Sequence, residues 1–212
     1  VMNAAFASTG QQCTATSRAI VEAGIYDQFV ARIVEKTKAL KVGDGTEAGI
    51  YMGPCVDESQ MKTVLDYIEK GKSEGCNLLA GGNRLEGALA KGYFVAPTIF
   101  ADVSPDATIA QEEIFGPVLA IIRANDYDDA MRIANNVRFG LSASILTKDL
   151  SAAFKYIHDI EAGLITVNLP SAGVEYQLPF GGVKDSSSGF REQGSVAINF
   201  YSELSTIYMK YR

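Results

Sequence analysis

The sequence has 212 residues, of which 47% are hydrophobic and 21% are charged, and this composition is typical of a folded globular protein. Nineteen basic and 25 acidic side chains give a formal net charge of −6, which argues against a nucleic-acid partner because phosphate binding requires a basic surface. No apolar run approaches the length of a membrane span, and the first residues lack the pattern of a signal peptide.

Apolar spacing predicts alternating strands and helices along the chain. Strands are predicted over residues 17–22, 77–80, 93–100, 117–123, 141–147 and 164–168. Helices are predicted over residues 27–40, 58–74, 126–137 and 149–161, the third with Asp126 as its N-cap and the last with Leu150, Phe154 and Ile157 facing inward. This alternation predicts an α/β fold, with a mostly parallel sheet covered by helices on both faces.

Residues 205–211 alternate polar and apolar side chains and predict one more strand, detached from the main pattern. A lone strand has unpaired N–H and C=O groups that invite pairing with another chain. We therefore expect residues 201–212 to serve oligomerisation.

The three cysteines and the single histidine limit the possible covalent and metal chemistry. An odd and sparse set of cysteines does not resemble a disulfide framework, so we expect a reducing, cytoplasmic compartment. No C-x-x-C pair is present, and we expect no metal site. Residues 43–48 fit the dinucleotide pattern G-x-G-x-x-A, but they follow a predicted helix and open a loop, so we interpret them as a structural turn.

Cys13 follows a glycine-containing turn and precedes a short apolar strand. A cysteine at such an element end can face a cleft, where backbone N–H groups can stabilise a thiolate and a developing oxyanion. The alternative is a buried, inert cysteine, which composition alone favours.

Three segments in this order resemble the aldehyde dehydrogenase family: F-x-x-x-G-Q-x-C at residues 6–13, E-E-I-F-G-P-V at 112–118, and Asn168 followed by P-F-G-G-V-K at 179–184. The resemblance covers essentially the whole chain. The last motif departs from the family at Ser187, where glycine is usual, and at Phe190, which is extra.

The resemblance implies that Cys13 is the nucleophile that forms a thiohemiacetal with an aldehyde. It implies that the backbone N–H of Cys13 is half of an oxyanion hole. Phe6 and Gln12 fall where the family's substrate tunnel is lined, and residues 169–178 fall at its entrance.

The cofactor implied by the resemblance is NAD or NADP. Glu113 is expected to bind the hydroxyls of the nicotinamide ribose, which suits a carboxylate that accepts two hydrogen bonds. Phe115 is expected to pack near the nicotinamide ring, and Phe180 to contact substrate.

The domain assignment that follows is a catalytic domain over residues 1–200. In the family, the cofactor-binding domain, a general-base glutamate and an asparagine oxyanion donor precede the cysteine motif. We therefore expect this chain to be a fragment that does not oxidise aldehydes alone. Residues 173–175 and 189–194 resemble bacterial dehydrogenases of α-ketoglutaric semialdehyde and related semialdehydes.

Two other classes of function remain open at this point. A cysteine hydrolase or acyltransferase requires a cysteine–histidine pair, for which His158 is the one histidine. A noncatalytic structural module would not require Cys13, Glu113 and Phe115 together.

Overall fold

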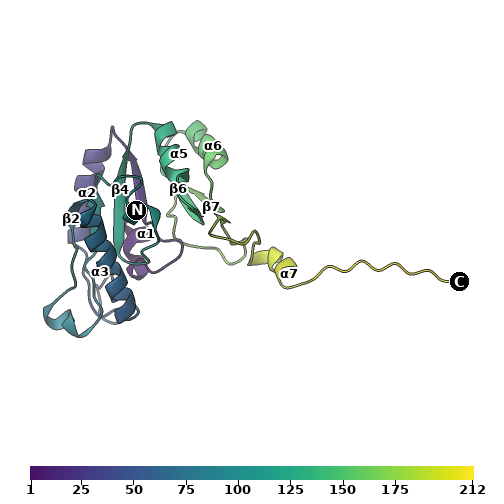
Figure 1. The fold of residues 1–212 in the computed structure, drawn as a ribbon, viewed down its shortest axis with the longest axis horizontal. Coiled ribbons are helices and arrows are strands. Elements are labelled where there is room, and N and C mark those ends of the chain that lie inside the picture. Colours follow the sequence, from purple (N-terminus) through teal and green to yellow (C-terminus); the bar gives the residue numbers. More distant parts are fainter.

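A computed structural model describes residues 1–212 (Figure 1). Its main sheet has four strands in the order β1-β4-β3-β2. These are Arg18–Glu22 (β1), Val118–Ala124 (β4), Thr98–Ala101 (β3) and Asn77–Ala80 (β2). The pairs β1–β4 and β4–β3 are parallel, and β2 is antiparallel to β3. The predicted α/β fold with a mostly parallel sheet is confirmed.

Alternate residues of β4 face two hydrophobic cores, which explains its nearly continuous apolar sequence. On one face, Ala120 and Ile122 pack with α3 (Glu58–Ser73) and α5 (Tyr127–Asn135). On the other face, Leu119 and Ile121 pack with α1 (Met2–Phe6) and α2 (Tyr26–Lys38). Helices therefore cover both faces of the sheet, as predicted.

Several helix ends follow from local sequence. Asp57 caps α3 by accepting a hydrogen bond from the Gln60 amide (2.8 Å), and Asp126 caps α5 through the Asp129 amide (2.9 Å). The chain leaves α3 through Gly75, whose φ of +80° favours glycine. Residues 43–48 form turns after α2, in agreement with the structural interpretation of that segment.

The predicted strand over residues 93–100 is shorter in the structure, where β3 begins at Thr98. Pro97 has no N–H to donate to a neighbouring strand. Short helical segments connect these elements: Ala7–Gly10 (η1), Gly87–Lys91 (η2) and Thr108–Gln111 (α4).

The second half of the chain forms two small sheets. Ser142–Ile145 (β6) pairs in parallel with Leu164–Val167 (β7), and Phe139–Gly140 (β5) pairs antiparallel with Val183–Lys184 (β8). The helix between β6 and β7 is Leu150–Asp159 (α6).

The prediction that the large apolar side chains of α6 face inward is wrong. Leu150, Phe154 and Ile157 are 71%, 58% and 42% exposed, whereas Ala153 and Tyr156 are buried. The helical period correctly groups the large apolar side chains on one face, but no element of this chain covers that face.

The end of the chain contains Gly194–Val196 (η3) and Ala197–Phe200 (α7), and residues 202–212 extend away from the body (Figure 1). The predicted strand over residues 205–211 does not form in the single chain, because it has no partner strand. Its expected pairing with another chain stays a prediction.

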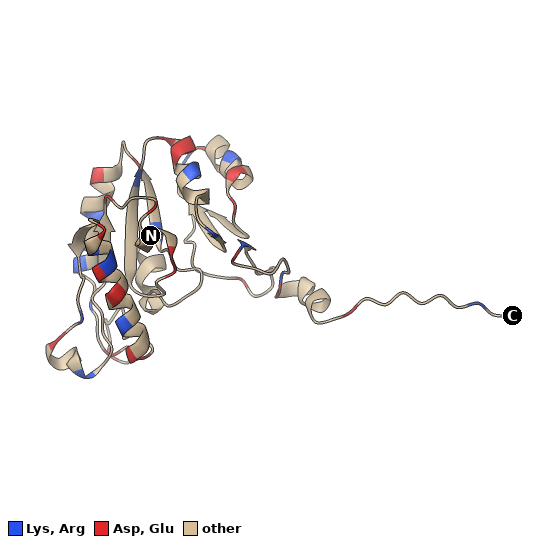
Figure 2. Ribbon diagram, viewed as in Figure 1, with Lys and Arg blue, Asp and Glu red and all other residues tan.

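Charges of both signs are interspersed over the helices (Figure 2). On α3, for example, acidic and basic side chains share the exposed face. Every helix in the structure is too short or too polar to span a bilayer.

Candidate active site

Cys13 occupies the corner of a tight turn just before β1. The turn is closed by a hydrogen bond from the Ala15 amide to the Gln12 carbonyl (2.9 Å). The Thr16 amide then bonds to the Ala4 carbonyl (3.0 Å), which ties the turn to α1. The Cys13 thiol is exposed, and neither its backbone N–H nor that of Thr14 has a hydrogen-bond acceptor in the structure. Two unpaired N–H groups are therefore available beside the sulfur.

The other two cysteines are structural. Cys55 and Cys76 are buried, and burial raises the pKa of both thiols, that of Cys55 to about 11. A thiol that resists ionisation is a poor nucleophile. Exposure therefore distinguishes Cys13 from both.

The segment before Cys13 is shaped by three consecutive residues with positive φ: Ser8 (+52°), Thr9 (+60°) and Gly10 (+66°). The Thr9 hydroxyl donates to the Gly53 carbonyl (3.1 Å). A Cβ atom on Gly10 would lie 2.2 Å from the carbonyl oxygen of Gly116, so only glycine fits. This contact joins the cysteine motif directly to the E-E-I-F-G-P-V motif.

Phe115 projects from that second motif with a φ of +55°, a backbone region that costs energy for a bulky residue. The Gln60 side-chain amide holds the segment by donating to the carbonyls of Ile114 (3.0 Å) and Phe115 (2.9 Å). The ring is 40% exposed as a result.

The two neighbouring glutamates have different environments. Glu112 accepts a hydrogen bond from the Tyr67 hydroxyl (2.7 Å), and this bond raises the pKa of the tyrosine. Glu113 is exposed and makes no hydrogen bond or ion pair in the structure, so its carboxylate is free for a ligand.

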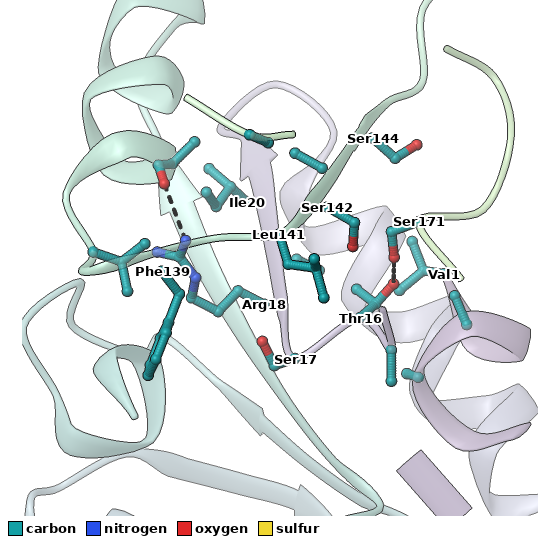
Figure 3. Close-up of a pocket in the computed structure, with 18 of the residues that line it drawn as sticks. Val1, Thr16, Ser17, Arg18, Ile20, Phe139, Leu141, Ser142, Ser144 and Ser171 are labelled. Carbon is teal, nitrogen blue, oxygen red and sulfur yellow. Dashed lines mark hydrogen bonds between the residues drawn. The ribbon is translucent and has the colours of Figure 1, made fainter. Parts of the chain in front are cut away.

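A cavity of about 850 Å³ brings these groups together. Its wall includes Gln12, Cys13, Glu113 and Phe115, and it continues between the edges of β1 and β6 (Figure 3). Figure 3 labels residues from both edges: Arg18 and Ile20 from β1, and Ser142 and Ser144 from β6.

Two residues expected at the site, Phe6 and Phe180, do not line this cavity, and neither does His158, which the alternative hydrolase hypothesis requires. Phe6, expected in the substrate tunnel, is fully buried in the core between α1 and the sheet, because it lies on the inward face of α1. Phe180 is not among the lining residues either, and its backbone pairs with Glu192. His158 is exposed in the last turn of α6 and does not line the cavity, so nothing places it as a base for Cys13.

Contacts that the sequence did not predict also build the site. Arg18, labelled in Figure 3, donates from its guanidinium to the carbonyls of Ile133 (3.2 Å) and Ala134 (3.0 Å). These carbonyls lie at the end of α5, where a cation is favoured, and burial lowers the pKa of the guanidinium. Asn168 has a φ of +57°, and its side-chain oxygen accepts from the Thr147 amide (2.9 Å). Arg18 lies in a predicted strand and Asn168 in a family motif, but no sequence pattern indicates these contacts.

The residues 1–212 contain no group of three or more histidine, cysteine, aspartate or glutamate side chains able to hold a metal ion. The reactive and polar groups that line the cavity include the Cys13 thiol, the free backbone amide of Cys13, the Glu113 carboxylate and the Phe115 ring.

Comparison with known proteins decides the family. The sequence profile described as "Aldehyde dehydrogenase family" matches residues 1–207. The chain belongs to the aldehyde dehydrogenase family. It is 49% identical over 211 residues to the alpha-ketoglutaric semialdehyde dehydrogenase of Bacillus subtilis, covering 99% of this chain and 43% of that protein. It is 42% identical to a betaine aldehyde dehydrogenase of Brucella anthropi, covering 97% of this chain and 42% of the relative.

Solved aldehyde dehydrogenase structures share the fold. The NAD+ complex of the Bacillus cereus aldehyde dehydrogenase superposes with a TM-score of 0.94 at 36% identity, covering all of this chain and 42% of that one. The chain thus spans less than half the length of the aldehyde dehydrogenases that it matches.

Proposed function

We propose that this chain is the cysteine-bearing part of an NAD(P)-dependent aldehyde dehydrogenase that oxidises an aldehyde to a carboxylic acid. The observation that carries the proposal is the convergence of Cys13, Glu113 and Phe115 on one cavity. The nucleophile and the nicotinamide contacts come from segments far apart in the sequence, and the contact between Gly10 and Gly116 fixes one against the other.

The proposed reaction begins when the Cys13 thiolate attacks the carbonyl carbon of the aldehyde. The oxygen becomes an alkoxide, and the unpaired backbone N–H of Cys13 is available to donate to it. Departure of a hydride from the thiohemiacetal carbon leaves a thioester on the same sulfur. Water then hydrolyses this thioester, which releases the acid and restores the thiol.

NAD or NADP would supply the hydride acceptor. The residues present fit its nicotinamide end, because Glu113 offers a carboxylate without another partner and Phe115 offers an exposed ring held by Gln60. We propose that Glu113 accepts hydrogen bonds from the ribose hydroxyls and that Phe115 packs against the nicotinamide. The choice between NAD and NADP lies with residues that contact the other end of the cofactor.

The proposed substrate is α-ketoglutaric semialdehyde or a related semialdehyde. Support comes from the names of two relatives, in Bacillus subtilis and Haloferax volcanii, which are 49% and 48% identical to this chain. Gln12 lines the cavity next to Cys13 and is the proposed substrate contact among the expected residues. Phe6 and Phe180 would need a different arrangement to reach the aldehyde.

We also propose that the functional protein is an oligomer in which residues 205–211 pair with a second copy, and that it works in the cytoplasm. The exposed apolar side chains of the tail, such as Ile207 and Met209, support the first proposal. The three free cysteines support the second.

A chimeric enzyme tests the proposed function. Residues 1–212 are joined to the part of the Bacillus subtilis relative that they do not span, and oxidation of α-ketoglutaric semialdehyde is followed by the absorbance of reduced NAD or NADP. Cys13→Ser is expected to lower turnover by about 10⁴-fold or more, as for other enzymes that lose their nucleophile. Cys76→Ala, a buried cysteine outside the cavity, is the matched control and should retain activity. Turnover that survives in Cys13→Ser would refute the assignment.

A further inference from the structure

One side chain links the two halves of the chain by hydrogen bonds. The Ser171 hydroxyl lies 2.7 Å from the Thr16 hydroxyl and donates to the Thr14 carbonyl (3.2 Å). These are the only hydrogen bonds between residues 138–212 and residues 1–124 in the structure; the other connections pass through α5 and its flanking residues. Figure 3 shows the Thr16–Ser171 bond at one side of the cavity.

The directions of these two bonds follow from proton counting. A hydroxyl carries one proton, and that of Ser171 is donated to the Thr14 carbonyl. Thr16 must therefore donate its own proton to Ser171. The result is a short chain from Thr16 through Ser171 to Thr14, which closes around the turn that presents Cys13.

The residues just before Ser171 are held to the sheet formed by β6 and β7. The Ser144 hydroxyl of β6 donates to the Leu169 carbonyl (2.6 Å), and the Thr166 hydroxyl of β7 lies within 3.4 Å of the Pro170 carbonyl. The segment that contains Ser171 is thus held to the sheet of β6 and β7. The hydrogen bonds of Ser171 connect this segment to the Cys13 turn.

The segment also forms part of the wall beside the thiol. Leu169, Pro170 and Ser171 line the same cavity as Cys13. Because β1 and β6 are not paired along their edges, no other direct hydrogen bond joins this wall to the turn, and the remaining links run indirectly through α5.

We infer that Ser171 is a positioning residue that clasps the 169–178 segment to the Cys13 turn and so limits the width of the approach to the sulfur. It thereby restricts the size of the electrophile that reaches Cys13. The extension to aldehyde substrates rests on the proposed function; the clasp itself does not.

The test uses the 212-residue chain without aldehyde or cofactor. Alkylation of Cys13 is timed with iodoacetamide and with a bulky fluorescein maleimide, and hydrogen exchange is followed in residues 13–16 and 169–178. In Ser171→Ala, the ratio of the bulky to the small reagent's rate should rise about three- to tenfold, and exchange should speed up in both segments, because a typical hydrogen bond has been lost. Thr16→Val, which removes the donor to Ser171, should shift both readouts in the same direction.

Ser73→Ala is the matched control, because its hydroxyl bonds only to the Lys70 carbonyl within α3. It should change neither readout. Ser171→Thr keeps a hydroxyl and should restore the wild-type ratio. The inference is overturned if Ser171→Ala and Thr16→Val leave the ratio unchanged, or if exchange quickens in residues 169–178 alone. Such a result would leave the role of Cys13 in aldehyde oxidation untouched, since that role is tested by turnover of the chimera.

Discussion

Gly10 packs against the backbone of Gly116 so closely that a Cβ atom on Gly10 would lie 2.2 Å from the Gly116 carbonyl oxygen. Gly116 is equally confined, since its own Cβ would lie 2.3 Å from a Val64 methyl group. The Cys13 turn and the Phe115 segment are therefore fixed against each other by main chain. Such a contact leaves little freedom in the distance between the proposed nucleophile, Cys13, and the proposed nicotinamide contact, Phe115.

Gly10→Ala should destabilise the protein by about 1–3 kcal/mol, because it combines a steric clash with a φ of +66°. Denaturant unfolding measures the effect. Gly24→Ala is the control, since a Cβ there meets nothing within 4 Å, and it should be close to neutral. Equal stability of the two variants would contradict the proposed close packing.

Cys13 should be alkylated before Cys55 and Cys76 in the folded chain, as peptide mapping after brief labelling would report. Cys13 is exposed and the other two are buried. Because the pKa of Cys55 is raised to about 11, that thiol stays protonated and slow to react through pH 9, and its labelling should quicken only as pH approaches 11. Faster labelling of Cys55 than of Cys13 at neutral pH would contradict the site.

The same raised pKa has a consequence for stability. The unfolded thiol releases its proton near its ordinary pKa, below that of the folded thiol, so the contribution of buried Cys55 is present at neutral pH and declines as pH rises toward 11. In Cys55→Ala, this alkaline loss of stability should be smaller than in the wild type. Parallel denaturation series between pH 8 and 10.5 provide the comparison, and identical slopes would speak against it.

Thr14→Val should leave stability unchanged or raise it by up to about 1 kcal/mol. The Thr14 hydroxyl is buried without a hydrogen-bond partner, so its replacement by a methyl group removes an unsatisfied polar atom. Thr98→Val provides the contrast, because that buried hydroxyl accepts from Gly82 N (2.9 Å) and donates to the Ala96 carbonyl (2.7 Å). It should cost about 1–3 kcal/mol in thermal or chemical unfolding. The reverse order of stability would show that the Thr14 hydroxyl has a partner.

Removal of residues 203–212 should reduce self-association without changing the stability of the body. Leu204, Ile207, Tyr208 and Tyr211 are at least 81% exposed and make no contact that stabilises the single chain. Sedimentation velocity of the full and shortened chains over a range of concentrations measures the effect. Unchanged association would assign the oligomer contact elsewhere, for example to the uncovered face of α6.

The regular elements were predictable because each has a strong local pattern. The apolar run of β4, the Asp57 and Asp126 caps and the Gly75 helix end all follow from residues close in sequence. The face of α6 was mispredicted because the helical period identifies an apolar stripe but not whether another element covers it.

The site was predictable only in part for a similar reason. Motifs predicted Cys13, Glu113 and Phe115, which lie in distinctive local sequence and line one cavity in the structure. The Gly10–Gly116 contact and the Ser171 bonds join segments distant in the chain, and a serine in a loop carries no periodic signal. Phe6 shows the opposite case, because the motif places it in a tunnel whereas its position on α1 buries it in the core.

The most direct test of the central claim is to trap the covalent intermediate on the chimeric enzyme. The enzyme is mixed with the semialdehyde and the nicotinamide cofactor, quenched in acid within the first turnovers, and digested for mass spectrometry. An acyl group is expected on the peptide that contains Cys13; it should disappear on longer incubation with water and be absent from Cys13→Ser. Turnover accompanied by an unmodified Cys13 peptide, or by an acyl group on Cys55 or Cys76, would contradict it.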